Sequence, residues 1–499
     1  MPGVLERTSI VVPTVGRPSL DALLDALASA TGPRPAALIL VDDRPAGPAL
    51  HPCRTGLPPV HVVRTGGGGP ARARNLGWRT AGTEWIAFLD DDVVPDPDWY
   101  ERLATDLAGL PSDVAGSQGR VRVPLPEGRR PTDWERGAAG LATSSWITAD
   151  LAYRRAALAA VGGFDERFPR AFREDSDLAL RVMDSGRRLV RGDRRISHPA
   201  RPAGRWISLR VQAGNADDVL MRRLHGRTWR DRADAPLGRR PWHTAITAAG
   251  FAAVGLAVAR RPRAAGVAAA AWLAGTAEFA SARIAPGPRD RHEVGTMLAT
   301  SALIPPLATW HWLRGVVQHR RVRPWRGLPD LVLFDRDGTL VHDFPYNGDP
   351  DWVRPVDGAQ EALDRLRARG VQIGVVSNQS GVARGLITLE QVKACNARLA
   401  ELLGPFDTVQ VCPHGPEDGC ACRKPEPGMV TAACAELDVD PARCVVVGDI
   451  GADVDAASAA GAVGILVPTP VTRRDEVDAA PQRAETLTHA VDGVLAGAW

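Results

Sequence analysis

The chain has 499 residues, of which 44% are hydrophobic, and a formal net charge of +3. Its length predicts about three domains with globular cores, and its odd number of cysteines, seven, implies no disulfide framework and suits a reducing compartment. The first residues, MPGVLERT, lack the apolar segment of a signal peptide, so we expect a cytoplasmic protein.

Strands and helices alternate in the first part of the chain. Apolar runs predict strands at 7–15, 36–41, 60–63 and 85–89, and helical spacing predicts helices at 20–28, with Ser19 as the N-cap, and at 71–79. This alternation predicts a doubly wound α/β sheet.

Acidic residues follow two of these predicted strands. Asp42 and Asp43 end the second strand, where the base of a ligand could be recognised. Asp90 and Asp92 in FLDDDV form a D-x-D pattern, which can hold a divalent cation across a diphosphate.

The motifs VVPTVGR, LVDD, ARARNLG and FLDDDV, in that order, resemble the family 2 glycosyltransferases of the GT-A fold. The later segments VGGFDERF (161–168) and REDSDLALRVMDSGRRL (173–189) fit the same resemblance, which covers about 7–225. It implies a nucleotide-sugar donor and a catalytic Mg²⁺ or Mn²⁺ held by Asp92. The donor would be bound by Pro13, Arg17, Asp42, Asp43, Asn75, Asp90 and Asp92.

The resemblance also implies an acceptor side. Glu174 and Asp175 match the family's ED motif, so we expect Asp175 to be the general base for an acceptor hydroxyl and Glu174 to orient it. His198 would either meet the diphosphate or lie at a strand end without a role.

Residues 236–327 are rich in alanine and arginine. Three long segments carry few or no charges: 244–259, which is bracketed by arginine pairs, 264–282 and 295–313. Residues 191–330 hold 24 arginines against nine acidic residues. We favour short membrane-embedded or interfacial helices with arginines at the anionic cytoplasmic face of the inner membrane. The alternative is a soluble Ala-rich helical bundle. The segment matches no known nucleic-acid-binding module, so we expect no nucleic-acid partner.

The last third of the chain carries four ordered motifs. LVLFDRDGTLV (331–341) and VQIGVVS (371–377) predict strands that end in Asp335 and Ser377, CRKPEPGM (422–429) supplies Lys424, and CVVVGD (444–449) ends in Asp449. Asp, Ser, Lys and Asp in this order resemble the haloacid dehalogenase (HAD) phosphatases. The wording is similar to their heptose 1,7-bisphosphate 7-phosphatase and histidinol-phosphate phosphatase subgroup, over 328–499.

The resemblance implies a nucleophile and a proton shuttle. Asp335 would attack phosphorus and form an aspartyl phosphate, and Asp337 would protonate the leaving oxygen and then deprotonate water. Mg²⁺ would be held by Asp335, the main-chain carbonyl of Asp337 and Asp449, with Asp453 behind them. The substrate's phosphate groups would be bound by Ser377, Asn378, Arg423 and Lys424. The chain has only two lysines, so the one beside Arg423 indicates a required point charge.

A cysteine-rich loop lies between these motifs. Cys412, His414, Cys420 and Cys422 match a closed structural zinc site of Cys₃His type, and the subgroup carries such a loop. The alternative is a cluster of free or oxidised cysteines.

Together these motifs predict three parts: a GT-A domain with a Rossmann-like α/β fold (1–235), a helical segment with a basic linker (236–327) and a HAD-like Rossmannoid domain with a zinc loop (328–499). The chain would be a bifunctional carbohydrate enzyme. It would remove the 7-phosphate of a heptose 1,7-bisphosphate and move a sugar from a nucleotide-sugar to a glycan or lipid-linked acceptor. The alternatives are histidinol phosphate as the substrate, and an inactive transferase half that binds glycans or docks on a membrane.

Overall fold

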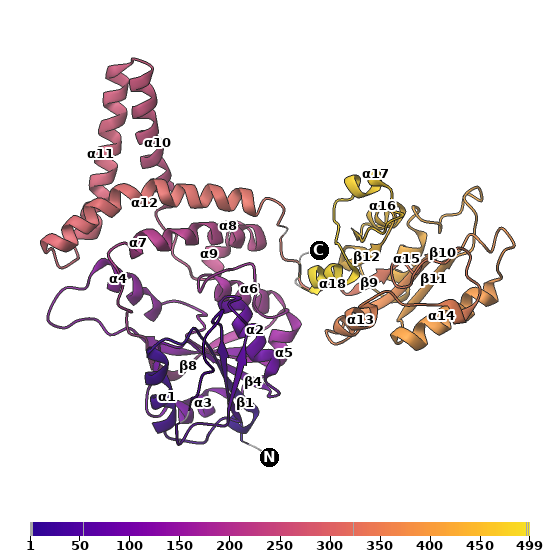
Figure 1. The fold of residues 1–499 in the computed structure, drawn as a ribbon, viewed down its shortest axis with the longest axis horizontal. Coiled ribbons are helices and arrows are strands. Elements are labelled where there is room, and N and C mark those ends of the chain that lie inside the picture. The colour runs from indigo at the N-terminus through magenta and orange to yellow at the C-terminus, as the bar shows by residue number, and fades with distance from the viewer. Residues whose placement is uncertain (1–2, 53, 323, 496, 498) are drawn as a thin grey trace. The chain divides into compact units, whose positions relative to one another are not determined.

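The structure is a computed structural model that describes residues 3–52, 54–322, 324–495, 497 and 499. The chain forms two compact units, Met1–Pro324 and Trp325–Trp499, each with its own sheet (Figure 1). The three helices of the central segment belong to the first unit. The finer division into three parts stays a prediction.

The first unit is built on an eight-stranded sheet in the order β3-β2-β1-β4-β7-β6-β8-β5. The strands are β1 (Thr8–Thr14), β2 (Ala37–Asp42), β3 (Val60–Arg64), β4 (Trp85–Leu89), β5 (Val94–Pro95), β6 (Val114–Arg122), β7 (Asp150–Arg154) and β8 (Arg188–Ser197). Strands β3, β2, β1 and β4 are parallel, and β7 runs antiparallel to both β4 and β6. The carboxyl ends of the four parallel strands therefore meet at one edge.

Helices pack on both faces of this sheet; the first six connect its strands and the last three follow β8. They are α1 (Ser19–Ser29), α2 (Pro70–Thr80), α3 (Trp99–Leu107), α4 (Asp133–Ala139), α5 (Arg155–Ala160), α6 (Glu174–Asp184), α7 (Ile207–Arg210), α8 (Gly214–His225) and α9 (Trp229–Arg232). The core between α1, α3 and the sheet is formed by buried leucines and aromatic residues, including Leu23, Leu27, Trp99 and Tyr100. The predicted α/β architecture of this unit is confirmed.

The predicted elements of the first 90 residues match observed ones within about two residues, with one correction at a helix start. Ser19 is the first residue of α1 and not its N-cap; Pro18 takes the N-cap position, and no side chain caps the helix. The physical reason is that Pro18 already has helical dihedral angles, so the helix starts one residue closer to the N-terminus than predicted.

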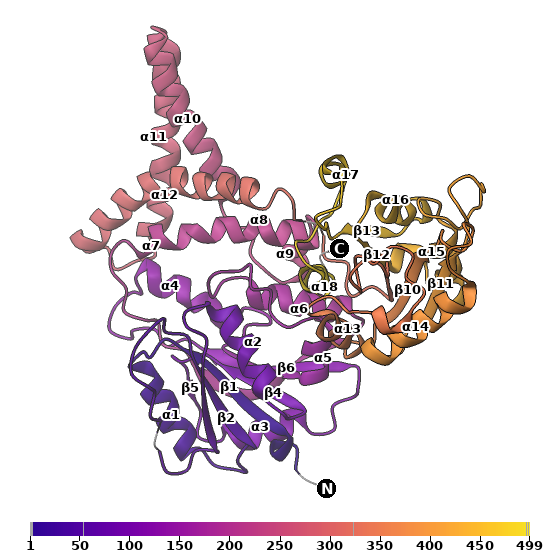
Figure 2. The same ribbon diagram turned by 45° about the vertical axis from the view of Figure 1, so that its right-hand side comes forward.

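The central segment forms three long helices, α10 (Arg240–Val258), α11 (Pro262–Ile284) and α12 (Arg291–Gln318). In Figures 1 and 2, α10 and α11 form a hairpin that stands out from the rest of its unit, and α12 runs across the base of the hairpin beside α8. Pro305 and Pro306 lie inside α12. Within the described residues, α10 is the one helix whose length and composition would suffice to cross a membrane.

The second unit has a parallel five-stranded sheet in the order β11-β10-β9-β12-β13. The strands are β9 (Leu331–Phe334), β10 (Gln372–Asn378), β11 (Thr408–Cys412), β12 (Cys444–Gly448) and β13 (Val463–Leu466). The helices are α13 (Ala359–Arg367), α14 (Leu389–Leu403), α15 (Gly428–Glu436), α16 (Gly451–Ala460), α17 (Arg474–Ala479) and α18 (Leu487–Leu495).

Alternate residues of the central strand β9 enter two different cores. Val332 and Phe334 pack with α13, α14 and α18, whereas Leu331 and Leu333 pack with α15 and α16. A strand that is buried on both faces is a continuous apolar run, which is why LVLF predicts it well. The polar residues that follow the strand are left at the carboxyl edge of the sheet.

Two candidate active sites and a candidate metal centre

The D-x-D segment of the first unit lies directly after β4, whose five residues are all buried. The Asp90 carboxylate accepts a hydrogen bond of 2.7 Å from Arg74 of α2, and the same guanidinium donates 2.8 Å to Glu174 at the start of α6. Arg74 is buried. One arginine therefore joins the D-x-D segment to the ED motif, which lies 84 positions after Asp90 in the chain and beside it in the fold.

Arg74 was not singled out from the sequence. The feature that could have identified Arg74 is its place on the buried face of α2, with Ala71, Ala73 and Trp78. A charged side chain on such a face requires a buried partner, and helical periodicity could have shown this position.

Asp92 is surrounded by positive and metal-binding groups. Its Oδ1 lies 3.6 Å from Nε2 of His198, and its Oδ2 accepts a hydrogen bond from Nε of Arg201. Ligand atoms of Asp90, Asp92 and His198 all lie within 4.8 Å of one another. Nδ1 of His198 and Oδ1 of Asp92 have no hydrogen-bond partner among the residues that the structure describes. Two carboxylates and an imidazole at this spacing fit a divalent cation.

Asp91, the middle residue of the D-x-D segment, has different partners from Asp90 and Asp92. Asp91 accepts hydrogen bonds of 2.7 Å from Thr14 and 2.6 Å from Arg17, which was predicted to bind the nucleotide-sugar. This contact ties the loop after β1 to the loop after β4 and leaves Asp90 and Asp92 on one side.

Asp42 and Asp43 lie at the same edge of the sheet, where Asp42 ends β2 and Asp43 follows it. Arg44 and Arg64 both donate to Asp42, and the bond from Arg44 holds the pKa of that carboxyl well below its usual range. Asp43 accepts from the Thr65 hydroxyl and from the Gly69 backbone at 3.0 Å. Beside them, Pro13 of β1 is half-buried and pairs with Val41 of β2.

Asn75 requires a correction. Its amide donates to the Phe164 carbonyl at 2.9 Å and to Glu166 at 2.8 Å, and its oxygen accepts from the Phe164 N–H and from the Trp78 indole. The side chain is buried, and both its donors and its acceptor are used inside the protein. Asn75 therefore holds α2 against the segment 164–166, and the geometry opposes the predicted contact with a nucleotide-sugar.

The ED motif begins helix α6. Glu174 is buried, and the loss of water together with the neighbouring Asp175 charge raises its pKa to about 8, although Arg74 opposes this shift. Asp175 is half-buried, accepts 2.7 Å from the Ser176 backbone, and has a pKa raised by burial. A carboxylate with a raised pKa is a better proton acceptor than an ordinary one near neutral pH.

In the second unit, the predicted strand-end groups meet at the carboxyl edge of the sheet. Nζ of Lys424 lies 2.5 Å from Asp335 and 2.5 Å from Asp453, and it donates 2.9 Å to the Val376 carbonyl. Burial raises the pKa of Asp335 well above its ordinary value, against the attraction of Lys424, and the Asp453 and Asp337 charges raise it further. Lys424 is therefore a buried point charge between two carboxylates.

Three buried carboxylates form a candidate cation site beside this lysine. Oxygens of Asp335, Asp449 and Asp453 lie within 4.8 Å of one another, and burial together with Asp453 raises the pKa of Asp449 to about 7. Two glycines permit this crowding. A Cβ at Gly338 would lie 2.3 Å from Asp449, and one at Gly448 would lie 2.2 Å from Asp453. Hard oxygen ligands with one neutralising lysine fit Mg²⁺.

Asp337 is held by two neighbours. Gln379 donates 2.8 Å to Asp337 and 2.8 Å to the Ser377 hydroxyl, and Arg336 forms an ion pair with Asp337 at 2.9 Å. Gln379 was not predicted as a site residue. Its signal was its place in the SNQSG segment two residues after Ser377.

The remaining predicted phosphate ligands lie close by. Asn378 exchanges two hydrogen bonds with the Lys424 backbone, at 3.1 and 3.2 Å, so it fixes the lysine's position. Arg423 is half-buried, and its guanidinium donates 3.3 Å to the His414 carbonyl of the cysteine-rich loop.

The four predicted zinc ligands converge. Cys422 Sγ lies 3.3 Å from Cys412 Sγ, 3.5 Å from Cys420 Sγ and 3.3 Å from His414 Nδ1. Four ligands about 2.0–2.3 Å from a tetrahedral zinc ion are separated by distances of this order, so the set fits zinc. Burial raises the pKa of Cys412 to about 12, whereas hydrogen bonds lower that of Cys420 to about 7 against some burial.

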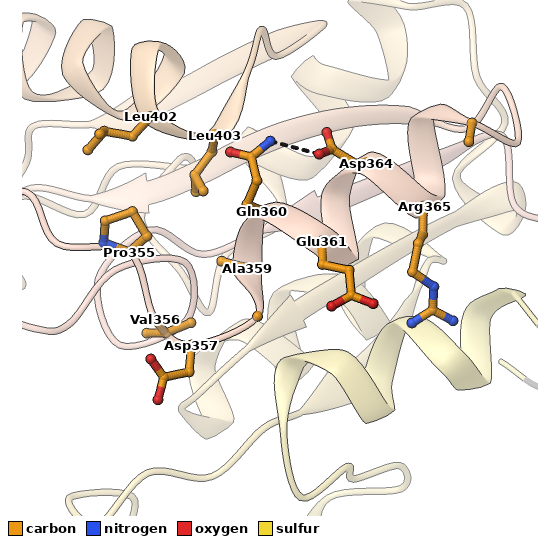
Figure 3. Close-up of a pocket in the computed structure, with 12 residues that line it drawn as sticks. Pro355, Val356, Asp357, Ala359, Gln360, Glu361, Asp364, Arg365, Leu402 and Leu403 are labelled. Carbon is orange, nitrogen blue, oxygen red and sulfur yellow. Dashed lines mark hydrogen bonds between the residues drawn. The ribbon is translucent and has the colours of Figure 1, made fainter.

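The second unit also has a shallow hollow of about 740 Å³ between α13 and the end of α14 (Figure 3). Its labelled side chains include Asp357, Glu361 and Arg365, and Gln360 donates 2.9 Å to Asp364 within it. The hollow contains none of the strand-end acids, so it is separate from the candidate site.

Comparisons with known proteins identify a domain in each half of the chain. The model of the family described as glycosyl transferase family 2 matches residues 9–156, and the model described as HAD-hydrolase-like matches residues 421–494. The chain therefore carries a glycosyltransferase domain followed by a hydrolase domain.

Curated relatives define the second domain further. The D-glycero-β-D-manno-heptose-1,7-bisphosphate 7-phosphatase of Pseudomonas putida is 38% identical over 145 residues, 28% of this chain and 82% of that protein. The Bordetella bronchiseptica enzyme of the same name is 39% identical over 144 residues, 28% of this chain and 80% of that protein. By this similarity the chain belongs to the family of heptose bisphosphate phosphatases, fused to a family 2 glycosyltransferase.

A solved structure is similar to the same region. The D,D-heptose 1,7-bisphosphate phosphatase of B. bronchiseptica, complexed with magnesium and phosphate, is 33% identical, covers 33% of this chain and 98% of its own, and gives a TM-score of 0.31.

Proposed function

We propose that the C-terminal unit removes the 7-phosphate of a heptose 1,7-bisphosphate in a Mg²⁺-dependent reaction. The carrying observation is the cluster of Asp335, Lys424, Asp449 and Asp453 at one edge of the sheet. The curated relatives named for this reaction support the choice of substrate.

In this proposal Asp335 is the nucleophile. One carboxylate oxygen of Asp335 attacks phosphorus, a bond forms between them, and the bond from phosphorus to the sugar oxygen breaks. Asp337, held by Gln379 and Arg336, gives its proton to the departing sugar oxygen. It then takes a proton from the water that hydrolyses the aspartyl phosphate, which releases phosphate and restores both acids.

The remaining groups position the phosphate. Asp335, Asp449 and the main-chain carbonyl of Asp337 would hold Mg²⁺, which neutralises phosphate charge when bound. Lys424 would add a positive charge, and the Ser377 hydroxyl a hydrogen bond. Arg423 would meet the second phosphate of the substrate. The Cys₃His cluster would hold zinc as a structural ion that keeps Arg423 and Lys424 in place, because Cys422 directly precedes them.

The test is phosphate release by the full chain with Mg²⁺, from heptose 1,7-bisphosphate and from histidinol phosphate in parallel. We expect preference for the bisphosphate, and we expect Asp335→Asn to lose at least a thousandfold in turnover, whereas the exposed control Asp357→Asn keeps it. Preference for histidinol phosphate would select the alternative substrate. Release from neither would refute the proposal.

We infer that the N-terminal unit transfers a sugar from a nucleotide-sugar to a glycan or lipid-linked acceptor, with Mg²⁺ or Mn²⁺. The carrying observation is that Arg74 joins Asp90 to Glu174, and so donor-side and acceptor-side motifs, in one buried network. Asp90, Asp92 and His198 would hold the cation, which steadies the departing diphosphate when bound. Asp175 would accept the proton of the acceptor hydroxyl as that oxygen attacks the anomeric carbon.

The test is hydrolysis of a panel of nucleotide-sugars by the full chain, with and without Mn²⁺. We expect one donor to be cleaved, Asp92→Asn to lose the metal-dependent rate, and the exposed Asp113→Asn to keep it. Absence of cleavage for all donors, with a bound glycan detected by calorimetry, would favour the alternative of an inactive glycan-binding module.

The two activities together would suit one route, in which a dephosphorylated heptose is later activated and transferred.

A further inference from the structure

The hairpin of α10 and α11 exposes large apolar side chains along its length. Phe251 and Val258 of α10 are 70% and 79% exposed, and Val254, Val267 and Leu273 are also exposed. In α10 the buried residues are confined to His243, Ile246 and Thr247, near its start. Beyond its first two turns, the hairpin is therefore covered by nothing within the described parts of the chain.

The two helices pack on each other through small residues. A Cβ at Gly275 of α11 would lie 2.7 Å from the Ile246 side chain, and one at Gly250 of α10 would lie 3.0 Å from the Trp272 ring. Apart from this seam, apolar residues extend around the circumference of α10 and around the part of α11 nearer the tip, whereas Glu278 and Arg283 of α11 lie toward the base. A helix that is apolar all round belongs in a large core or in a membrane. A protein partner would require only one apolar stripe.

Helix α12 adds a second apolar surface at the base of the hairpin. One face of α12 is buried, with Gly315 packed against Ala216 of α8. The opposite face carries Leu303, Trp310 and Val317, which are exposed and lie seven residues, or about two turns, apart. Figures 1 and 2 show α12 crossing the base of the hairpin, with the two helices standing away from it.

Arginines lie at both ends of the hairpin. Arg260, Arg261 and Arg263 lie at its tip and form no ion pair within the described residues. Arg239 and Arg240 lie at its base, where Arg239 pairs with Glu278 and Arg240 stacks on Trp312 of α12. The 19 residues of α10 span about 28 Å, close to the thickness of a hydrocarbon core, which is about 30 Å.

We propose that the occupant of this surface is a lipid bilayer with anionic headgroups. The hairpin enters the hydrocarbon core, with an arginine cluster at headgroup depth at each end. Helix α12 lies in the near interface, with Leu303, Trp310 and Val317 toward the lipid and its buried face on α8. The transferase domain is thereby held at a membrane surface, where a lipid-linked acceptor would be found.

The test is co-flotation of the full chain with phosphatidylcholine vesicles, with and without phosphatidylglycerol. We expect flotation with both kinds of vesicle and tighter binding to the anionic one. Phe251→Asp combined with Val254→Asp should lower the partition coefficient at least tenfold, because apolar burial drives insertion. Each of Arg260→Gln, Arg261→Gln and Arg263→Gln should lower it about fivefold on anionic vesicles only.

Controls separate lipid binding from misfolding and from self-association. Val409→Asp introduces the same charge at an exposed apolar position of the second unit and should leave flotation unchanged. Circular dichroism should show that the double variant keeps its helix content. Failure to float, or flotation unaffected by the double variant, would overturn the proposal. A dimer that forms without vesicles and is absent in the double variant would also overturn it and assign the surface to a second copy of the chain.

Discussion

At the scale of single residues, arginines form hydrogen bonds with the acidic residues of the candidate transferase site. Arg74 holds Asp90 and Glu174 in place, and Arg17 holds Asp91. Arg201 differs from these two, because its Nε contacts Asp92, a residue that the proposed cation requires. A bound cation and the guanidinium would compete for the negative charge of the same carboxylate, because Arg201 bonds Oδ2 while Oδ1 has no hydrogen-bond partner among the described residues.

This competition predicts the behaviour of one variant. Arg201→Gln should tighten Mn²⁺ binding in the absence of donor about tenfold, because a charge-assisted hydrogen bond to Asp92 is removed. Titration calorimetry of the full chain measures this affinity. Arg122→Gln, which removes an exposed arginine that bonds Ser197, is the matched control and should change nothing. An unchanged affinity in Arg201→Gln would show that Arg201 does not compete with the metal.

At the scale of elements, a buried charge cluster joins α6 to α8. Asp177 of α6 accepts 2.9 and 2.6 Å hydrogen bonds from Arg181 one turn later and lies 2.8 Å from Nε2 of His225 at the end of α8. Asp177 is fully buried, and although burial opposes it, the positive Arg181 together with the bond from His225 lowers its pKa to about 2. This cluster fixes the helix that carries Asp175.

The cluster predicts a pH-dependent contribution to stability. Asp177→Asn should lower the free energy of unfolding by about 3–5 kcal/mol at neutral pH, because it leaves buried charges without their partner. The folded pKa is depressed, so the stabilisation is complete above about pH 4 and is lost as the pH falls toward 2. Urea unfolding should therefore show a difference in unfolding free energy between wild type and variant, and this difference should become smaller as the pH falls.

A control on the same helix makes this prediction specific. Asp184→Asn removes a half-exposed ion pair with Arg232 and should cost less than about 1 kcal/mol. A gap for Asp177→Asn that stayed constant from neutral pH to about pH 3 would contradict the assigned linkage.

At the scale of the whole molecule, the chain consists of two compact units with separate cores. The Cys₃His cluster proposed to hold zinc lies in the second unit, from the last residue of β11 to the segment before α15. Each unit should therefore have its own unfolding transition, and the loss of an interaction in one unit should lower the stability of that unit alone.

Zinc removal tests this independence. Treatment with a zinc chelator, or Cys420→Ser, should lower the calorimetric transition of the second unit by about 4–8 °C if the ion contributes about 2 kcal/mol. Asp177→Asn should move only the other transition. The conservative control Cys395→Ser changes a cysteine outside the cluster and should leave zinc content, measured by atomic absorption, unchanged. A chelator that shifted both transitions equally would contradict independent unfolding.

The sequence by itself determined the two α/β sheets, the fused enzyme classes and most of the strand-end acids, because buried parallel strands are continuous apolar runs that end in polar residues. It also indicated the four residues of the Cys₃His cluster, since they lie within eleven positions. Only the tertiary structure decided which distant side chains meet: Arg74 between Asp90 and Glu174, Arg201 on Asp92, Gln379 on Asp337, and Asn75 in packing. These contacts join residues up to about a hundred positions apart, and local pattern and propensity carry no information about such distances.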